Sequence, residues 1–374
     1  MRILFPFVGD NYGGSHASTL SLIEKLRENH SVDIIIGLHE PGYFSSILDQ
    51  RGFDWCSLPK IHYVEGCNII KQLIQMFLCI KQLSEYIKKL NIDIVHTNDR
   101  RMHLSWLLAA KVSKASHIWH QRSAISSGRM SIYMLIPDAV VTISSYCRDS
   151  LSSYARKRTI IIDNPVTLAT SQDSSKEKKF LNLACISENK SVKNILFVGN
   201  WLEQKRPLTF VRSAKYIIER YSKCVMFTMV GEERQPMKLS VRNEIFKLGL
   251  ESSFRLVGAQ SDMLPWYKEA DLVVAPAMNE GLGRTLIEAS ILGIPVIASR
   301  HGGHLEIIKN GVTGTFFEPD DPSDLADKVI NFFSHEDQAH KMALVAKNNC
   351  LERFSPSVHA NKVYSLYKLL MEQT

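Results

Sequence analysis

DLVVAPAMNEGLGRTLIEASILGIPVIASR, residues 271–300, is the stretch of this 374-residue chain that decides its fold. The apolar run 272–275 predicts a strand, residues 285–292 after a glycine-containing turn predict an amphipathic helix, and 295–298 predict a second strand. Such a strand–turn–helix–strand unit indicates a parallel sheet. Glu280 and Glu288 bracket the turn, with seven residues between them. They stand where a parallel sheet opens its ligand crevice and where a helix N-terminus offers unpaired N–H groups to phosphate.

The rest of the chain repeats this alternation in two series. In the first, strands are expected at residues 3–8, 32–37, 93–96, 118–120, 139–143 and 160–162, with helices at 18–27 and 69–90. In the second, strands are expected at 194–198, 224–230, 254–257, 272–275, 295–298 and 314–317. The stretch 170–193 breaks the pattern and is interpreted as a linker or surface loop. We therefore expect two doubly wound α/β domains facing an interdomain cleft, a common place for a ligand.

The length fits two domains, because single cores stop growing at roughly 250–300 residues. The tail, residues 357–372, predicts a helix that must pack on something. Its broad apolar face carries Val358, Val363, Leu366, Tyr367, Leu369 and Leu370.

Composition narrows the classes of partner. A net charge of +7 suggests a nucleotide, a membrane surface or nucleic acid, although a solvated basic surface is equally compatible. Nucleic acid is the weakest option because no helix-turn-helix, RRM or zinc-finger pattern is present. No apolar run approaches the about 20 residues that span a bilayer, and MRILFPFVGD at the N-terminus indicates a first strand, not a signal peptide. Seven scattered cysteines without a CxxC pair fit a reduced cytosolic chain without structural zinc.

Each notable motif also has an ordinary structural interpretation. Thr285 and Glu288 have the spacing of a helix capping box, and a loop glutamate such as Glu280 is commonly just solvated. The basic pair at 205–206 is commonly a solvated face, the glycine pair at 13–14 a tight turn, and a lone strand-end histidine such as His120 a structural one.

The predicted helix 69–90 also has two interpretations. Its apolar face favours a helix packed on the core. Its lysines allow the alternative of an interfacial helix on anionic lipid; they are Lys71, Lys81, Lys88 and Lys89.

Several motifs occur in the order seen in the family-4 glycosyltransferases of the GT-B fold, and the chain resembles that family over nearly its whole length. In the first half these are GGSHASTL (13–20), DIVHTND (93–99), IWHQRS (118–123), VVTISSYCRDSL (140–151) and IIDNPV (161–166). In the second half, where the resemblance is more specific, they are LFVGNWLEQKRP (196–207), the Glu-x7-Glu block NEGLGRTLIEASILGIPVIAS (279–299) and GGHLEIIKNGVTGTFFEPDDPSDLA (302–326).

The resemblance implies two Rossmann-like domains. An acceptor-side domain would span residues 1–168, a linker 169–193, and a nucleotide-sugar domain 194–356, while the helix in 357–374 would pack back on the first domain. The implied reaction is retaining transfer of a sugar from a nucleotide-diphosphate sugar to a glycan or lipid-linked glycan acceptor. Bacterial surface polysaccharide or lipopolysaccharide assembly is the commonest setting for such enzymes.

The resemblance also assigns roles to residues. It implies that Glu288 binds ribose, that Glu280 lies against the donor sugar, and that Lys205 neutralises the leaving diphosphate. The implied donor-binding set comprises Gly14, Asn200, Lys205, Arg206, Gly281, Gly283, Arg284, Thr285, Leu286 and Glu288. The implied catalytic residues are Glu280, His120 and Lys205, and the acceptor-side residues are Gly13, His96, Asp99 and Arg122.

One position departs from the family pattern. The family's Arg after the strand glycine is Asn200 here, which leaves Arg206 or Arg284 to replace the lost charge. No Asp-x-Asp metal motif is present, so we expect no metal or other cofactor, with a lysine and a helix dipole facing the diphosphate. A GT-B epimerase and a non-catalytic partner subunit are the alternatives. We expect a cytoplasmic protein that uses UDP- or GDP-linked donors and no nucleic acid, with peripheral association with the inner face of the cytoplasmic membrane as an option.

Overall fold

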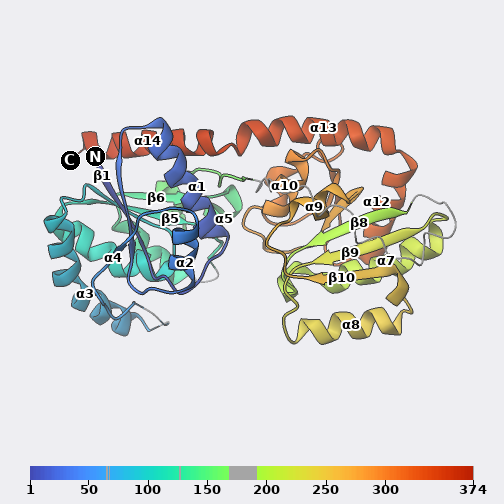
Figure 1. Cartoon of the computed structure of the whole chain (residues 1–374), viewed down its shortest axis with the longest axis horizontal. Coiled ribbons are helices and arrows are strands. Elements are labelled where there is room, and N and C mark those ends of the chain that lie inside the picture. The colour runs from blue at the N-terminus through green and yellow to red at the C-terminus, as the bar shows by residue number, and fades with distance from the viewer. Residues whose placement is uncertain (65, 67, 126–127, 168–191, 374) are drawn as a thin grey trace. The chain divides into compact units, whose positions relative to one another are not determined.

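The computed structural model of the chain divides into two compact units (Figure 1). The N-terminal unit comprises Met1–Pro165 together with Phe354–Thr374, and the C-terminal unit comprises Val166–Arg353. The structure describes residues 1–64, 66, 68–125, 128–167 and 192–373. Nearly all of the predicted linker 169–193 therefore lies outside the described residues, and strand β8 begins at its last residue, Lys193.

The N-terminal unit is built on a seven-stranded, wholly parallel sheet with the order β3-β2-β1-β4-β5-β6-β7. The predicted strands are all present, with ends shifted by at most two residues, and the two-residue β3 was not predicted. The strands are β1 (Arg2–Phe7), β2 (Asp33–Leu38), β3 (Cys56–Ser57), β4 (Ile94–Thr97), β5 (Ser116–Gln121), β6 (Ala139–Thr142) and β7 (Thr159–Ile161). The helices are α1 (Gly14–Asn29), α2 (Tyr43–Gln50), α3 (Ile69–Lys89), α4 (Arg100–Ser113), the 3-10 helix η1 (Gly128–Leu135), α5 (Ser145–Asp149), α6 (Ser153–Arg158) and α14 (Pro356–Glu372).

Alternate side chains of β1 enter two separate apolar cores. Ile3, Phe5 and Phe7 pack with residues of α1, α2 and α14 on one face of the sheet. Leu4, between them, packs with residues of α3 and α4 on the other face. A central parallel strand is covered by helices on both faces, which explains why this segment is a continuous apolar run.

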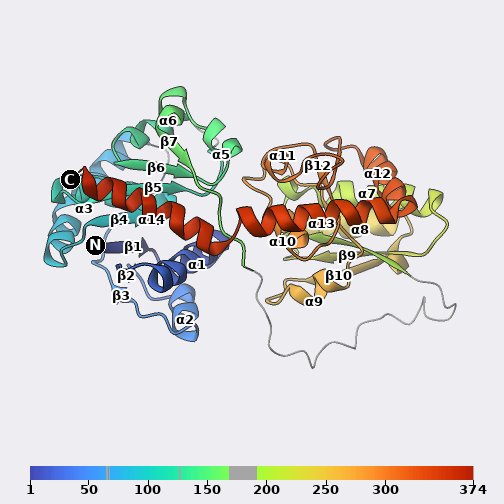
Figure 2. The same ribbon diagram turned by 90° about the horizontal axis from the view of Figure 1, so that it is seen from above.

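The last helix, α14, packs against α1, and Figures 1 and 2 both place it over the sheet of the N-terminal unit. Its buried side chains include Val363, Leu366, Tyr367 and Leu370, as the apolar pattern predicts. The prediction was wrong for Leu369, which is exposed, because the buried stripe continues through His359 and Ala360 instead.

Helix α1 begins earlier than predicted. Residues 18–27 carry the apolar pattern, but the helix starts at Gly14, with Gly13 as its N-cap. The polar first turn is held by tertiary packing: the His16 ring lies 4.8 Å from the ring of Phe44 in an edge-on contact. A pattern of apolar residues cannot reveal a helical turn that packs through a histidine.

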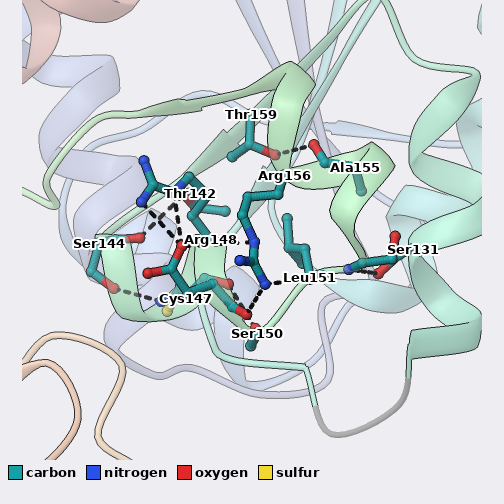
Figure 3. Close-up of polar contacts among 12 residues, drawn as sticks. Ser131, Thr142, Ser144, Cys147, Arg148, Ser150, Leu151, Ala155, Arg156 and Thr159 are labelled. Carbon is teal, nitrogen blue, oxygen red and sulfur yellow. Dashed lines mark hydrogen bonds and ion pairs between the residues drawn. The ribbon is translucent and has the colours of Figure 1, made fainter.

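The segment after β6 forms two short helices that are fixed by side-chain-to-backbone hydrogen bonds (Figure 3). Ser144 caps α5 by accepting from the Cys147 amide at 3.0 Å. Arg156 of α6 donates to the Leu151 carbonyl at 3.2 Å, and Thr159 donates to the Ala155 carbonyl at 2.8 Å. These bonds satisfy helix termini that would otherwise be left open, which lets such short helices persist.

The C-terminal unit is built on a six-stranded parallel sheet with the order β10-β9-β8-β11-β12-β13. Its strands are β8 (Lys193–Val198), β9 (Val225–Val230), β10 (Phe254–Gly258), β11 (Leu272–Ala275), β12 (Val296–Ser299) and β13 (Thr315–Phe317). Its helices are η4 (Glu203–Lys205), α7 (Pro207–Arg220), α8 (Met237–Lys247), η5 (Glu251–Ser253), α9 (Leu264–Lys268), α10 (Arg284–Ile291), α11 (His304–Ile307), α12 (Pro322–Ser334) and α13 (Glu336–Arg353). All six predicted strands are present.

The faces of this second sheet are again covered by different helices. Phe197 and Ile195 of β8 pack with residues of α7, α8 and α12, whereas Leu196 packs with residues of α9 and α10. The predicted α/β class and the two doubly wound parallel sheets are confirmed. Among the described residues, no helix is both long enough and apolar enough to cross a bilayer.

Candidate functional site

The order of strands in the C-terminal sheet defines a switch point at β8. Strand β8 has β9 on one side and β11 on the other, so the chain leaves β8 and β11 in opposite directions along the sheet. Ligands of open parallel sheets bind beyond the carboxyl ends of the strands at such a point. The loops that follow β8 and β11 meet there, because the Met278 amide donates to the Gln204 carbonyl at 2.7 Å. A small cavity lies between them, and its lining includes Lys205, Glu280 and His304.

Lys205 and Glu280 form an ion pair in this cavity. Lys205 Nζ donates to Glu280 Oε2 at 2.5 Å, and each side chain is 22% exposed. The structure therefore brings together the predicted diphosphate cation and the predicted sugar-binding acid. Without a ligand each group is the counter-ion of the other.

Two glycines make room for this arrangement. Gly199, at the end of β8, has φ +155, and the methylene chain of Lys205 passes 3.5 Å from where a Cβ of Gly199 would lie. Gly231, at the end of β9, has φ +149, and a Cβ there would lie 2.0 Å from the Gly199 carbonyl oxygen. Only glycine allows the two strand ends to approach this closely. The backbone at the switch point is thereby fixed.

Asn200 and Arg206 also lie in the loop after β8, but neither brings an unpaired charge to the cavity. Asn200 Oδ1 accepts from the Glu232 amide at 3.1 Å, so this side chain ties the β8 loop to the β9 loop. Arg206 has a left-handed backbone, with φ 51. Its guanidinium pairs with Asp320 at 2.8 Å and donates to the Glu203 carbonyl at 3.0 Å. The structure does not bring Arg206 together with Lys205 and Glu280.

Helix α10 starts directly at the crevice. Gly283 is its N-cap, with φ +86, and no side chain caps the helix. The capping-box interpretation of Thr285 and Glu288 is therefore wrong: the helix begins at Arg284, so neither residue stands at a capping position. The Leu286 amide donates to the Gly283 carbonyl at 3.0 Å, which removes one of the three amides predicted to face phosphate. Within the described part of the chain, the amides of Arg284 and Thr285 have no backbone acceptor.

Glu288 is held by two partners one turn into the helix. Arg284 Nε donates to Glu288 Oε1, and the Tyr267 hydroxyl donates to Glu288 Oε2, each at 2.8 Å. Burial and the adjacent Glu288 carboxylate raise the pKa of Tyr267 well above its ordinary value, so it stays a donor. Tyr267, on α9, was not predicted, and no motif in the sequence marks it. The second predicted acid is thus also paired with a cation.

A third loop, after β12, packs on the turn that carries Glu280. The Gly303 amide donates to the Glu280 carbonyl at 2.8 Å, and a Cβ on Gly303 would lie 2.6 Å from the Gly281 carbonyl oxygen. This close approach brings His304, the first residue of α11, to the edge of the cavity. His304 was not predicted. The signal that could have found it is a histidine directly after a glycine pair at the end of a buried strand.

The remaining predicted residues lie in the N-terminal unit. Gly13 and Gly14 start α1, a helix of 16 residues without an acidic side chain in its first turn. Asp99 caps α4 by accepting from the Met102 amide at 3.1 Å, and burial raises its pKa. Arg122 binds Asn98 Oδ1 through Nε at 3.0 Å and Nη2 at 2.8 Å, and burial lowers its pKa to about 9.

The two predicted histidines of this unit contact each other. His96 Nε2 lies 3.1 Å from His120 Nδ1, and His96 Nδ1 lies 2.6 Å from the hydroxyl of Tyr367 on α14. Both rings are fully buried. Burial, together with the charge of Arg122, lowers the pKa of each well below its ordinary value. At neutral pH both histidines are therefore uncharged, and each can donate one hydrogen bond and accept one.

The arrangement at the C-terminal switch point has a definite chemical capacity. Two acids and two cations are paired as Lys205–Glu280 and Arg284–Glu288, beside the Arg284 and Thr285 amides at the start of α10. A diphosphate can take the cations and amides, while the acids can accept hydroxyl hydrogens. Among the described residues, no group of three His, Cys, Asp or Glu side chains is placed to hold a metal ion.

Comparisons with known proteins show to which family the chain belongs. The family "Glycosyl transferases group 1" matches residues 184–349, and "Glycosyltransferase Family 4" matches residues 12–170. The uncharacterized glycosyltransferase MJ1607 of Methanocaldococcus jannaschii is 30% identical over 96% of this chain and 95% of its own length. This chain belongs to glycosyltransferase family 4. It is accordingly a transferase, and the predicted family is confirmed.

Two other relatives match over different extents. The UDP-Gal:alpha-D-GlcNAc-diphosphoundecaprenol alpha-1,3-galactosyltransferase of Escherichia coli is 24% identical over 92% of this chain and 90% of its own length. The 2-deoxystreptamine N-acetyl-D-glucosaminyltransferase of Niallia circulans is 27% identical, but the match covers 47% of this chain and only 45% of that relative.

Solved structures share the fold. A glycosyltransferase from Rickettsia africae ESF-5 superposes with a TM-score of 0.81 at 22% identity, over 100% of this chain and 99% of that one. Anabaena Alr3699/HepE, solved in complex with UDP and glucose, superposes with a TM-score of 0.76 at 18% identity, over 98% and 99% of the two chains. The family-4 chain described here therefore has the GT-B fold that the resemblance predicts.

Proposed function

We propose that this chain is a retaining glycosyltransferase that moves a sugar from a UDP- or GDP-linked donor to a glycan or lipid-linked glycan acceptor. The observation that carries this proposal is the pair of internal ion pairs, Lys205–Glu280 and Arg284–Glu288, at the switch point of the C-terminal sheet. The structure of HepE, which shares this fold and was solved in complex with UDP and glucose, supports a nucleotide sugar as the donor.

Each group at the switch point suits one part of such a donor. Glu288 lies one turn into α10, where its carboxylate can accept both hydroxyls of a ribose. Lys205 and the Arg284 and Thr285 amides at the start of α10 suit the diphosphate, because charge-assisted hydrogen bonds to phosphate oxygens are strong. Glu280, once Lys205 turns to phosphate, can accept hydroxyls of the sugar.

The proposed transfer proceeds on one face of the donor sugar. The acceptor oxygen forms a bond to the anomeric carbon as the bond from that carbon to the diphosphate oxygen breaks, and a donor phosphate oxygen takes the acceptor proton. Negative charge then builds on the leaving diphosphate, where Lys205 and the start of α10 stabilise it. Glu280 orients the sugar and forms no covalent bond. We propose that these protein cations replace a metal, so a chelator should leave turnover unchanged.

The acceptor side is proposed to lie in the N-terminal unit, where His96, Asp99, Arg122 and the start of α1 gather near the carboxyl ends of β1, β4 and β5. The Escherichia coli relative is named for transfer to a diphosphoundecaprenol-linked sugar. This supports a lipid-linked acceptor, in the assembly of bacterial surface polysaccharide or lipopolysaccharide.

Helix α3 supports peripheral association with the inner face of the cytoplasmic membrane. One of its faces is buried on the core, as the first interpretation expects, but the opposite face is also apolar. Ile70, Phe77 and Leu78 are 70%, 65% and 68% exposed. Lysines at 71, 81, 88 and 89 are exposed on the same helix, which suits an anionic lipid surface.

Flotation with liposomes tests the membrane proposal. Wild-type protein should float with vesicles containing phosphatidylglycerol, and Phe77→Asp combined with Leu78→Asp should abolish flotation. Phe246→Asp is the matched control, because Phe246 is 75% exposed on α8 of the other unit. Flotation that survives the α3 substitutions would contradict the assignment to this helix.

A thermal-shift screen against UDP-, GDP- and ADP-sugars tests the enzymatic proposal. The expected result is a shift with one class of donor, followed by transfer from that donor to a lipid-linked glycan. Donor binding without either transfer or slow donor hydrolysis would instead favour a non-catalytic partner subunit.

A further inference from the structure

His304 is buried beside the ion pair at the switch point and has no role in the proposed reaction so far. It begins α11, directly after Gly302 and Gly303, and lines the same cavity as Lys205 and Glu280. Its side chain is 1% exposed. Buried polar groups are generally hydrogen-bonded, and among the described residues only Nδ1 of this ring has protein partners, while Nε2 is left for a ligand in the cavity.

The partners of His304 Nδ1 determine which ring nitrogen carries the hydrogen. Ser299 Oγ donates to the Ala277 carbonyl at 2.5 Å, which uses the only hydrogen of that hydroxyl. His304 Nδ1 lies 3.2 Å from Ser299 Oγ and 3.2 Å from the Ser299 carbonyl oxygen. Both atoms can then only accept, so Nδ1 carries the hydrogen. Burial lowers the pKa of His304 to about 4, so the ring is neutral at pH 7 and Nε2 bears a lone pair.

The position of Nε2 places that lone pair at the start of α10. A Cβ built on Gly283, the N-cap of α10, would lie 2.8 Å from His304 Cδ2 and 3.5 Å from Nε2. This edge of the ring therefore lies against the N-cap, where glycine leaves space. Within the described part of the chain, no side chain or amide donates to Nε2.

The chemistry of a neutral acceptor selects among the parts of a nucleotide sugar. A phosphate oxygen is itself an acceptor, so it gains nothing from a lone pair and is repelled by it. The ribose hydroxyls are already assigned to Glu288, one turn into α10. A hydroxyl of the transferred sugar can donate, and Glu280 on the same cavity is already assigned to that sugar.

We propose that His304 Nε2 accepts a hydrogen bond from a hydroxyl of the transferred sugar, which makes His304 a residue that determines donor-sugar specificity. This inference rests on the proposed function, because it requires a nucleotide sugar at the switch point. It predicts that the residue acts on the sugar and not on the nucleotide.

Two substitutions distinguish the roles of the two ring nitrogens of His304. His304→Asn retains an N–H near the position of Nδ1, which can still donate to Ser299, and leaves no acceptor at Nε2. His304→Gln places an amide oxygen near the position of Nε2. Calorimetry with the nucleotide sugar that gives the largest thermal shift, and with its nucleoside diphosphate alone, measures the contribution of the sugar. His304→Asn should weaken the nucleotide sugar about fivefold to tenfold and leave the nucleoside diphosphate unchanged, and His304→Gln should restore most of the loss.

The alternatives give different results. Equal weakening of both ligands by His304→Asn, or an unchanged ratio of the two dissociation constants, would overturn the proposal. If His304→Asn does not fold, His304→Met, a similar-sized side chain without a nitrogen, gives the same comparison. Wild-type protein that binds the nucleoside diphosphate but no nucleotide sugar would also overturn it, and wild-type protein that binds neither would overturn the proposed function first.

Discussion

Lys205 Nζ lies 2.5 Å from Glu280 Oε2 at the switch point of the C-terminal sheet, so the two groups neutralise each other in the ligand-free protein. The pair joins the loop after β8 to the loop after β11, 75 positions apart in sequence. Because a diphosphate carries more negative charge than one carboxylate, we expect donor binding to draw Lys205 away from Glu280. The acid is then released to the sugar in the same step.

Lys205→Ala should lower kcat by about 100-fold to 1,000-fold, because it removes a positive charge from the position where negative charge builds on the leaving group. Steady-state transfer assays at saturating donor measure this. Lys215→Ala, on the exposed side of α7, is the matched control and should leave kcat unchanged. A Lys205→Ala variant with wild-type kcat would remove Lys205 from the reaction.

The two glutamates should respond differently to removal. Glu288→Ala should raise the donor dissociation constant by roughly 100-fold, because hydrogen bonds from two ribose hydroxyls to a carboxylate are lost. Glu280→Ala should mainly lower kcat, because the sugar loses its orientation while the nucleotide keeps its contacts. Calorimetry with the nucleoside diphosphate separates binding from turnover. Unchanged kinetics in both variants would remove the assignment of the donor site.

Removing Arg284 or Arg206 in turn tests which of the two replaces the positive charge that the family has at position 200, where this chain has Asn200. Arg284 is bound to Glu288 at 2.8 Å beside the crevice, whereas Arg206 is bound to Asp320 at 2.8 Å. We expect Arg284→Ala to weaken the nucleoside diphosphate about tenfold, through loss of a charge-assisted bond to phosphate. Arg206→Ala should leave that affinity unchanged. The opposite result would place the compensating charge on Arg206.

The positions of several site residues could be predicted because they depend on short local stretches of sequence. Glu280 and Glu288 follow a buried strand and enter a helix, and parallel strands necessarily bring such strand ends to one edge of a sheet. Lys205 comes shortly after β8. Because β8 lies beside β11 in the sheet, this loop is brought to the same edge as the loop that carries Glu280. The pattern of apolar residues therefore located the strands and the sheet edge where these residues lie, whereas their roles came from the family resemblance.

The rest of the site depends on contacts that no local pattern encodes. The sequence left Arg206 and Arg284 equivalent, whereas in the structure tertiary packing brings Asp320 to Arg206. Tyr267 reaches Glu288 only because α9 packs beside α10. His304 acquires its defined tautomer from Ser299, whose own hydrogen is used by the Ala277 carbonyl. Each of these contacts is made by tertiary packing and leaves no pattern of apolar residues in the sequence.

The burial of His359 on α14 should make the stability of the folded protein depend on pH. Its Nδ1 lies 2.7 Å from the Asp163 carbonyl oxygen, and the side chain is fully buried beside His120. Burial, and after it the charge of Arg122, lowers the pKa of His359 to about 3. In the unfolded chain the pKa of a histidine is about 6.5. Below about pH 6.5 the unfolded chain therefore binds a proton that the folded protein does not, so the free energy of unfolding falls as the pH decreases from about 6.5 to 3.

His359→Asn should remove the contribution of His359 to this pH dependence while keeping an N–H that can donate to the Asp163 carbonyl. Between about pH 7.5 and pH 5, the wild-type protein should lose up to about 2 kcal/mol more unfolding free energy than the variant, since one proton contributes about 1.4 kcal/mol per pH unit. Urea unfolding followed by tryptophan fluorescence at the two pH values measures the difference. His340→Asn, at an exposed position of α13, should behave like the wild type. If His359→Asn retains the full wild-type loss at low pH, His359 does not contribute to the acid sensitivity that other buried histidines, such as His96 and His120, also confer on the N-terminal unit.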